Sequence, residues 1–182
     1  MNPSSPNKTG LQYGLITGVL YAILLFLRYR YFASNPVSFG IFVFVSYLMV
    51  LVMFFFTAIA RRKELGGYGE FREIFTSVFV AILVAELFYV VFNIIYLKYV
   101  DPSFWENFKT TSLQYLQKLN ATQEQIDQQM KSFKDAGQQT KPVGLVKGYG
   151  FGVVVDCVFG LIFTMILRRK NPNAPVNSEG SK

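Results

Sequence analysis

The chain contains no histidine and only one cysteine, Cys157. Histidine is the most common general acid or base, and cysteine and histidine together bind most zinc ions in proteins. Both kinds of site are therefore excluded, and a single cysteine cannot form an intramolecular disulfide. Acidic residues are also few, 11 against 18 Lys and Arg. We therefore expect that the protein is not an enzyme, and we predict no catalytic residue, no cofactor and no metal site.

Long apolar runs are what the sequence has in abundance. Of its 182 residues, 52% are hydrophobic and 17% are aromatic, which is more than soluble domains usually contain. Two of the runs, at 39–60 and 148–167, end in the same basic triplet, Arg-Arg-Lys. A helix of about 20 apolar residues is long enough to cross the hydrocarbon core of a bilayer. The sequence therefore predicts a membrane protein.

Four such spans can be placed, at about 10–27, 39–60, 74–97 and 144–167. The segment 98–143 between the third and fourth spans is polar and shows helical periodicity, with start signals at Asp101-Pro102 and at Thr122. We expect two amphipathic helices there, at about 102–119 and 123–136. The predicted fold class is an all-α integral membrane protein, a four-helix transmembrane bundle with an extracytoplasmic amphipathic hairpin between helices 3 and 4.

The basic residues near the span ends orient the protein. One face carries eight of them and the opposite face four. The first group is Lys8, Arg61, Arg62, Lys63, Arg72, Arg168, Arg169 and Lys170, and the second is Arg28, Arg30, Lys98 and Lys147. Because Lys and Arg are retained on the cytoplasmic side, both the N-terminus (1–9) and a disordered tail (168–182) are predicted to be cytoplasmic. This distribution explains the net charge of +7 without a nucleic-acid partner.

Small residues recur every four positions in the first and the last span. The ladders include Gly10, Gly14 and Gly18 in the first, and Gly148, Gly152 and Gly160 in the last. Small residues at this spacing allow helix backbones to approach closely in lipid. We predict that these two spans contact each other within the chain. The alternative is that one ladder forms a homodimer interface.

Two acids interrupt the apolar spans, Glu86 in the third and Asp156 in the fourth. Counted at 1.5 Å per residue, they lie about 18 Å and about 16 Å from the inner ends of their spans, so they share a depth near the bilayer centre. Tyr89 and Asn93 lie on the same helix face as Glu86 and could be its partners. The four residues form a candidate polar site. They either hold the spans together by hydrogen bonds, or they line a site for a proton, a cation or a small cationic ligand.

The order of these features resembles a known family across about residues 8–170. A glycine-bearing first span is followed by an Arg-rich turn into Gly66-Gly67-Tyr68-Gly69-Glu70-Phe71, then by Asp101-Pro102 and a last glycine-rich span with an acid. The chain is similar to the four-span membrane proteins of domain-of-unknown-function family 4199, found in Bacteroidetes. The resemblance implies a multi-pass protein of the bacterial inner membrane, and it implies no activity.

Two functions follow from the sequence. The first is a structural or accessory membrane protein that packs through its glycine ladders and buried acids, with a partner membrane protein or a second copy of itself in the lipid bilayer. The alternative is an oligomeric proton- or cation-linked transporter that uses Glu86 and Asp156.

Overall fold

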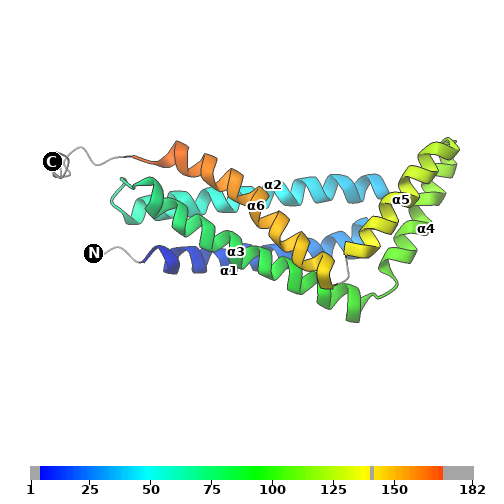
Figure 1. Ribbon diagram of the computed structural model, residues 1–182, viewed down its shortest axis with the longest axis horizontal. Coiled ribbons are helices and arrows are strands. Elements are labelled where there is room, and N and C mark those ends of the chain that lie inside the picture. Colours follow the sequence, from blue (N-terminus) through cyan, green and yellow to red (C-terminus); the bar gives the residue numbers. More distant parts are fainter. Residues whose placement is uncertain (1–4, 140–141, 170–182) are drawn as a thin grey trace.

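The computed structural model describes residues 5–139 and 142–169, and these form a bundle of helices (Figure 1). The helices are α1 (Pro6–Leu27), α2 (Pro36–Glu64), α3 (Phe71–Ile95), α4 (Phe104–Lys118), α5 (Gln123–Gln139) and α6 (Pro142–Leu167). The π-helical segments η1 (Arg28–Phe32) and η2 (Tyr96–Val100) extend α1 and α3. Lys170 and the rest of the predicted tail lie outside the described residues.

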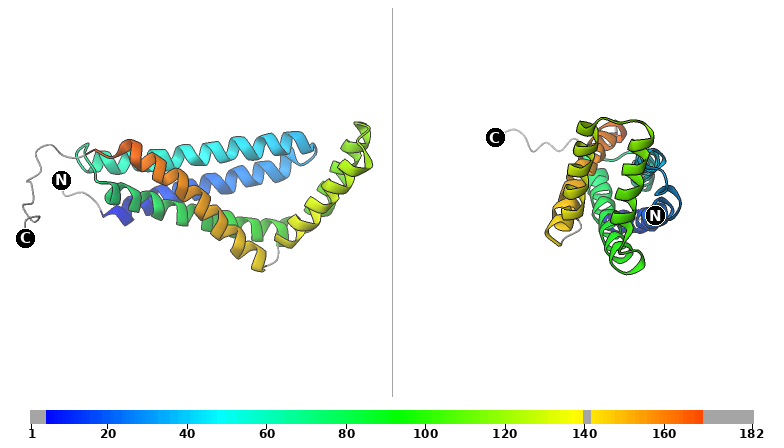
Figure 2. Two further views of the ribbon diagram at one scale, coloured as in Figure 1. Left: turned by 45° about the horizontal axis from the view of Figure 1, so that its top comes forward. Right: turned by 90° about the vertical axis from the view of Figure 1, so that its right-hand side faces the viewer.

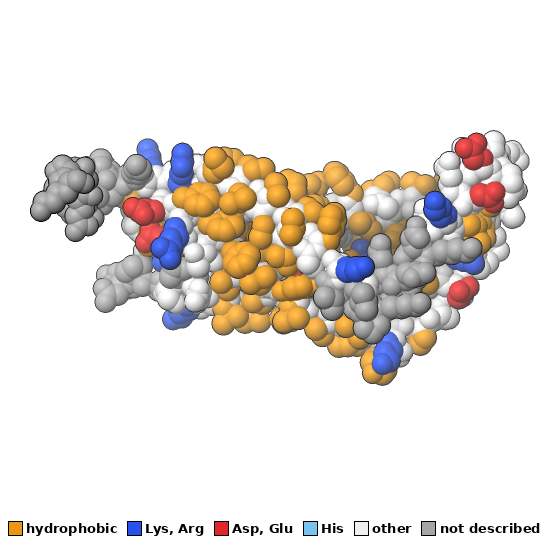
Figure 3. Space-filling model, in the orientation of Figure 1, with side chains coloured by type: hydrophobic (Ala, Val, Ile, Leu, Met, Phe, Trp, Pro, Cys, Tyr) orange, Lys and Arg blue, Asp and Glu red, His pale blue; other side chains and the backbone are white. Residues whose placement is uncertain are grey.

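Four segments are long and apolar enough to cross a membrane: Asn7–Phe32, Pro36–Glu64, Phe71–Val100 and Lys147–Leu167. This finding confirms the prediction of an all-α membrane protein with four transmembrane helices. Figure 3 shows the corresponding surface, on which hydrophobic side chains form a wide band across the middle while charged side chains gather toward the two ends. The protein is therefore a multi-pass membrane protein.

Local sequence signals explain where the spanning helices begin. Asn35 caps α2 by accepting hydrogen bonds from the backbone N–H groups of Val37 and Ser38, and Pro36 follows at the first helical position. At the start of α3, Glu70 and Glu73 form a reciprocal capping box. These caps satisfy backbone donors that have no partner inside the helix.

Helix α1 packs along α3, and its glycines make this close contact possible. A Cβ atom built on Gly14 would lie 3.0 Å from the Cα of Ala81, and one built on Gly18 would lie 2.6 Å from the ring of Phe88. Gly10 likewise faces the backbone of Ser77. The predicted contact between the first and last spans is therefore wrong, because α3 occupies the glycine face of α1. The spacing predicted a close helix contact but not the identity of the partner.

Helix α6 also packs against α3, but over only part of its length. Gly160 lies against Val78 and Ile82, whereas Cβ atoms built on Gly148 or Gly150 would meet nothing within 4 Å. Figure 2 shows α6 crossing α3 obliquely and separating from it toward the N-terminal end of α6. The bundle is therefore closed in one half and open in the other.

The closed half ends where the α2–α3 turn meets the start of α1 and the end of α6 (Figure 1). Gly69 and Arg169 exchange two backbone hydrogen bonds of 2.9 and 3.1 Å, which join the turn to α6. Gly66 and Gly67 have φ angles of 75° and 87°, which glycine adopts without strain. The basic residues of the last turn of α2 and those directly after α6 therefore gather at one end of the molecule, called here the terminal end.

At the opposite end, α4 and α5 form a helical hairpin that turns away from the bundle axis (Figure 2). Its root is an aromatic cluster in which Phe104 contacts Tyr29 at a ring-centroid distance of 4.6 Å. Phe108 stacks on Phe104 and also contacts Phe39 and Phe133. This cluster attaches the hairpin to η1 and α2, and we call this end the hairpin end.

Candidate intramembrane binding pocket

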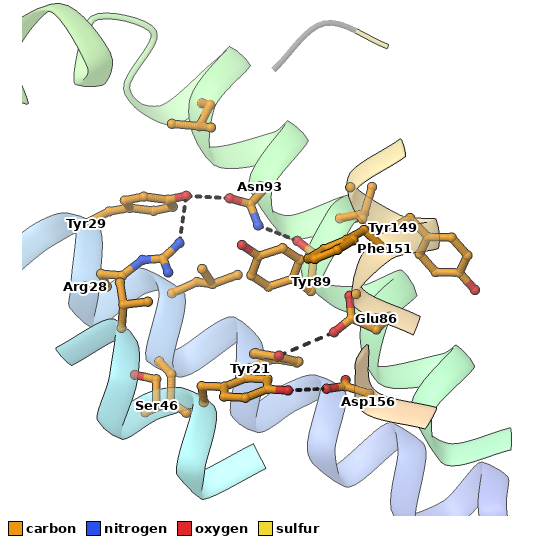
Figure 4. Close-up of a pocket in the computed structure, with 18 of the residues that line it drawn as sticks. Tyr21, Arg28, Tyr29, Ser46, Glu86, Tyr89, Asn93, Tyr149, Phe151 and Asp156 are labelled. Atoms are coloured by element: carbon orange, nitrogen blue, oxygen red, sulfur yellow. Dashed lines mark hydrogen bonds between the residues drawn. The ribbon is translucent and has the colours of Figure 1, made fainter. Parts of the chain in front are cut away.

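The open half of the bundle contains a pocket of about 550 Å³ between α1, α2, α3 and α6 (Figure 4). It extends from Glu86 and Asp156 in the middle of the spans to Trp105 of α4 at the hairpin end. Below the acids, toward the terminal end, the helices are tightly packed, and Val50, Phe54 and Val78 are completely buried there. The pocket therefore ends at the two acids.

Glu86 and Asp156 are both almost fully buried, with 4% and 1% of their surfaces exposed. Each accepts a hydrogen bond from a tyrosine of another helix. The Tyr47 hydroxyl of α2 donates to Asp156 Oδ1 at 2.9 Å, and the Tyr21 hydroxyl of α1 donates to Glu86 Oε1 at 3.4 Å. All four membrane-spanning helices thus contribute one side chain to this acid site.

The carboxyl groups of Glu86 and Asp156 lie beside each other (Figure 4). A hydrogen bond between two carboxyl groups requires that one of them carries a proton, because a carboxylate can only accept. The Oδ2 atom of Asp156 is buried and has no hydrogen-bond partner among the described residues. With one shared proton the pair carries a single negative charge, and its remaining oxygen lone pairs can accept hydrogen bonds from a bound cationic group.

Gly152 explains why Glu86 can reach Asp156. A Cβ atom built on Gly152 would lie 2.6 Å from Glu86 Oε2, so any larger residue would displace the carboxyl group. Gly152 lies one helical turn before Asp156 on α6. Gly152 therefore leaves space for Glu86 of α3 to lie beside Asp156 of α6.

A second polar group lies farther toward the hairpin end, around Arg28 and Asn93 (Figure 4). The Arg28 guanidinium donates to the Tyr29 hydroxyl at 3.1 Å, and that hydroxyl donates to Asn93 Oδ1. The Asn93 amide in turn donates to the Tyr89 carbonyl at 2.7 Å. Asn93 is therefore linked to Arg28 and not to Glu86.

Four buried polar atoms on side chains that line the pocket have no hydrogen-bond partner among the described residues. They are Arg28 Nε, Ser46 Oγ, Trp105 Nε1 and Asp156 Oδ2. A buried polar group without a partner costs about 1–3 kcal/mol, so such groups are rare unless water or a ligand supplies the partner. Their concentration around one cavity makes that cavity the candidate site for bound water or a polar ligand.

The structure brings the four predicted site residues, Glu86, Tyr89, Asn93 and Asp156, to one pocket. The partners predicted for Glu86 are different, because its hydroxyl donor is Tyr21 of α1 and not a residue of its own helix. Sequence reasoning also did not identify Tyr47, Arg28 or Trp105. A signal for Tyr21 and Tyr47 was available, because tyrosine prefers the membrane interface and these two tyrosines lie near the middle of a span.

Among known proteins, the chain matches a family model described as "Protein of unknown function (DUF4199)" over residues 12–169. No curated protein and no solved structure matches the chain.

Proposed function

We propose that this chain, which belongs to the DUF4199 family of proteins of unknown function, binds a small cationic ligand at Glu86 and Asp156 in its intramembrane pocket. The observation that carries this proposal is the pairing of two buried carboxyl groups at the closed end of a cavity. The match to the family adds no chemistry, so the function has to be inferred from the site.

The electrostatics of the acid pair favour a cation. A charged side chain near the bilayer centre costs about 2.5–3.5 kcal/mol, and two neighbouring carboxylates repel each other in addition. The described residues hold neither acid in a salt bridge. A shared proton would leave the pair with one negative charge, and a ligand cation beside the pair would neutralise that charge, which gives a physical reason for binding.

The walls of the pocket suit an organic cation better than a bare metal ion. Tyr21 and Tyr89 contact each other at a ring-centroid distance of 5.1 Å beside the acids, and Phe151 and Tyr149 line the α6 side. Aromatic faces attract cations and also bury the apolar part of a ligand. A primary amine with a short hydrocarbon chain has both of these properties.

Transport is a further part of the proposal. Among the described residues the pocket reaches as far as the acids, and toward the terminal end the helices pack tightly around the buried side chains of Val50, Phe54 and Val78. Passage through the membrane would need this half to open, or a second copy to complete the path. We therefore propose ligand binding in a proton- or cation-linked, oligomeric transporter, and not an enzyme.

The location follows from the charge distribution. We propose that the terminal end faces the cytoplasm in a bacterial inner membrane, because the basic residues of the last turn of α2 and those directly after α6 gather there. The pocket would then be nearer the extracytoplasmic side, beneath the α4–α5 hairpin.

A structural or accessory role is the second candidate, and the closed half of the bundle supports it. There the glycines of α1 and Gly160 of α6 bring three helices together around a tightly packed core. In this role the acids would only hydrogen-bond the helices to one another, through Tyr21 and Tyr47. It predicts that changes at the acids lower stability without affecting any ligand.

The test is the binding of hexylammonium to the detergent-solubilised protein. The chain has a single tryptophan, Trp105, and it lines the pocket, so its fluorescence reports occupancy. We expect saturable binding by the natural sequence, and affinity at least about tenfold lower for Glu86→Gln and for Asp156→Asn, since each removes a charge-assisted hydrogen bond. Glu106→Gln, an acid exposed on α4, is the matched control.

Two results would reject ligand binding at the acids. One is no saturable binding by the natural sequence, and the other is equal affinity in the acid variants and in Glu106→Gln. If those variants also melt at lower temperature, the acids serve the structural role. The transport part is tested separately, by proton flux and hexylammonium uptake in liposomes with the same variants.

A further inference from the structure

Arg28 is the feature of the pocket that cation binding does not explain. Its guanidinium lies over the rings of Tyr29 and Phe39, at 4.8 and 5.4 Å from their centroids, and donates to the Tyr29 hydroxyl. Its Nε atom is buried without a partner. Among the described residues no carboxylate forms a salt bridge with it. A guanidinium charge within a membrane span therefore has aromatic neighbours but no anion.

Trp105 extends the same group of donors. It lines the pocket at the hairpin end, and its indole Nε1 is buried and unpartnered. Both Arg28 and Trp105 can only donate hydrogen bonds. The unpartnered acceptors in the deep part of the pocket are Asp156 Oδ2, beside Glu86, and the Ser46 hydroxyl, which can also donate. The pocket thus offers acceptors at its closed end and donors at its hairpin end.

The helix geometry gives the separation of these two ends. Tyr21 bonds to Glu86, and Arg28 follows seven residues later on α1, which is about 10 Å along the axis at 1.5 Å per residue. A charge-assisted hydrogen bond takes about 3 Å at each end. If the ligand lies in line between the two ends of the pocket, its own charges are about 4 Å apart. If it lies alongside the groups that bind it, its charges are about 10 Å apart.

We infer that the ligand is an elongated zwitterion, whose cationic group binds Glu86 and Asp156 and whose anionic group binds Arg28. This inference rests on the proposed function and names its ligand class. An α-amino acid is too short, because only Cα and the carboxyl carbon follow its nitrogen and its charges lie about 2.5 Å apart. Each added residue lengthens a peptide by about 3.5 Å, so a di- or tripeptide has the required length, as does an ω-amino acid.

When the acid pair shares one proton, a ligand of this kind pairs the remaining negative charge of the acids and the positive charge of Arg28 at once. A cation alone would neutralise the acid pair that shares one proton and leave Arg28 unpaired, and an anion alone would do the reverse. Buried charges are stable when they are paired and hydrogen-bonded. The aromatic side chains between the two ends provide an apolar wall for the middle of the molecule.

The experiment compares 6-aminohexanoate with hexylammonium, which differ only by a carboxylate in place of a methyl group, and adds glycine as the short zwitterion. Affinities are measured by Trp105 fluorescence and by calorimetry on the full chain. We expect 6-aminohexanoate to bind at least about tenfold more tightly than hexylammonium, because it gains a charge-assisted hydrogen bond, and glycine to bind more weakly than both. In Arg28→Gln the two six-carbon ligands are expected to bind equally.

Arg30→Gln is the matched control, because Arg30 lies two residues away on η1 and is exposed. It should retain the full preference for 6-aminohexanoate, and Arg28→Lys should retain part of it. Equal affinities of 6-aminohexanoate and hexylammonium for the natural sequence would overturn the zwitterion inference, whether or not Arg28→Gln folds. If hexylammonium binding still depended on Glu86, cation binding at the acids would hold without the zwitterion inference. If neither compound bound, the proposed function itself would be rejected.

Discussion

At the residue scale, the acid site depends on tyrosines as much as on acids. Tyr47 and Tyr21 donate to Asp156 and Glu86 from two different helices, so each acid is bonded to a helix other than its own. A buried acceptor that loses its only donor pays its full desolvation cost. The hydroxyl groups therefore stabilise the bundle and position the carboxyl groups at the same time.

Replacing Tyr47 by phenylalanine tests this role. The change keeps the ring and removes the donor to Asp156 Oδ1, so we expect a loss of about 1–3 kcal/mol in the free energy of unfolding. The measurement is reversible unfolding in mixed detergent micelles. Tyr31→Phe, on a residue with 64% of its surface exposed, serves as control and should leave the free energy of unfolding unchanged. Equal stability of both variants would show that the hydroxyl of Tyr47 contributes nothing.

The sequence predicted the acids of the site because a carboxyl group in an apolar span is conspicuous. It did not predict Arg28, since the apolar run of the first span ends at Leu27 and the next residues resemble an interface. In the structure η1 continues the helix through Phe32, and Arg28 turns into the pocket. Arg28 was not identified because the sequence does not define the end of a span precisely.

At the element scale, α3 is the central helix of the bundle. It receives the glycine face of α1 on one side and Gly160 of α6 on another. The small-residue ladders predicted that α1 and α6 would each approach another helix closely. They did not predict that both helices would pack against α3, because a ladder describes the surface of one helix and does not identify the helix that packs on it.

Gly14→Ala tests the contact of α1 with α3. The new Cβ atom would lie 2.8 Å from Val84 Cβ and 3.0 Å from the backbone of Ala81, which cannot move aside. Overpacking of this kind costs about 1–3 kcal/mol, so we expect a lower unfolding temperature. Gly40→Ala is the matched control, because Gly40 is also helical and nothing lies within 4 Å of its added Cβ. Equal melting temperatures of the two variants would contradict the packing described.

Gly152→Ala distinguishes an effect on ligand binding at the acids from an effect on helix packing. Its Cβ atom would displace the Glu86 carboxyl group, which is the end of a flexible side chain and can move. We therefore expect at least about tenfold weaker hexylammonium binding, with a smaller change in unfolding temperature than Gly14→Ala causes. Gly150→Ala, with open space around the added atom, should bind like the natural sequence. Normal binding by Gly152→Ala would show that Glu86 does not need its present position.

At the scale of the whole molecule, the chain has two unlike ends. The start of α1, the α2–α3 turn and the end of α6 form the terminal end, and α4 and α5 form the hairpin end (Figure 1). The four apolar spans alone were enough to predict the helix class and the membrane location. The pocket was not predictable in the same way, because it arises from the oblique crossing of α6 over α3, which depends on side-chain packing between distant segments.

The orientation of these ends can be measured in intact cells. In a Cys157→Ser background, we expect Lys118→Cys, on exposed α4, to react with a membrane-impermeant maleimide. Lys63→Cys, exposed at the end of α2, should react only after the cells are lysed, since positive residues are retained in the cytoplasm. The reverse labelling pattern would place the terminal end outside and invert the proposed topology.

The most direct test of ligand binding at the acid pair is the distance from the ligand nitrogen to the two carboxyl carbons. Solid-state NMR of the protein in lipid, with ¹³C-labelled Asp and Glu side chains and ¹⁵N-hexylammonium, measures it. Binding as proposed predicts dipolar coupling at about 4 Å or less, to one Glu and one Asp carbon, which disappears in the Glu86→Gln, Asp156→Asn double variant. Coupling that persists in the double variant, or none in the natural sequence, would contradict a cation site at Glu86 and Asp156.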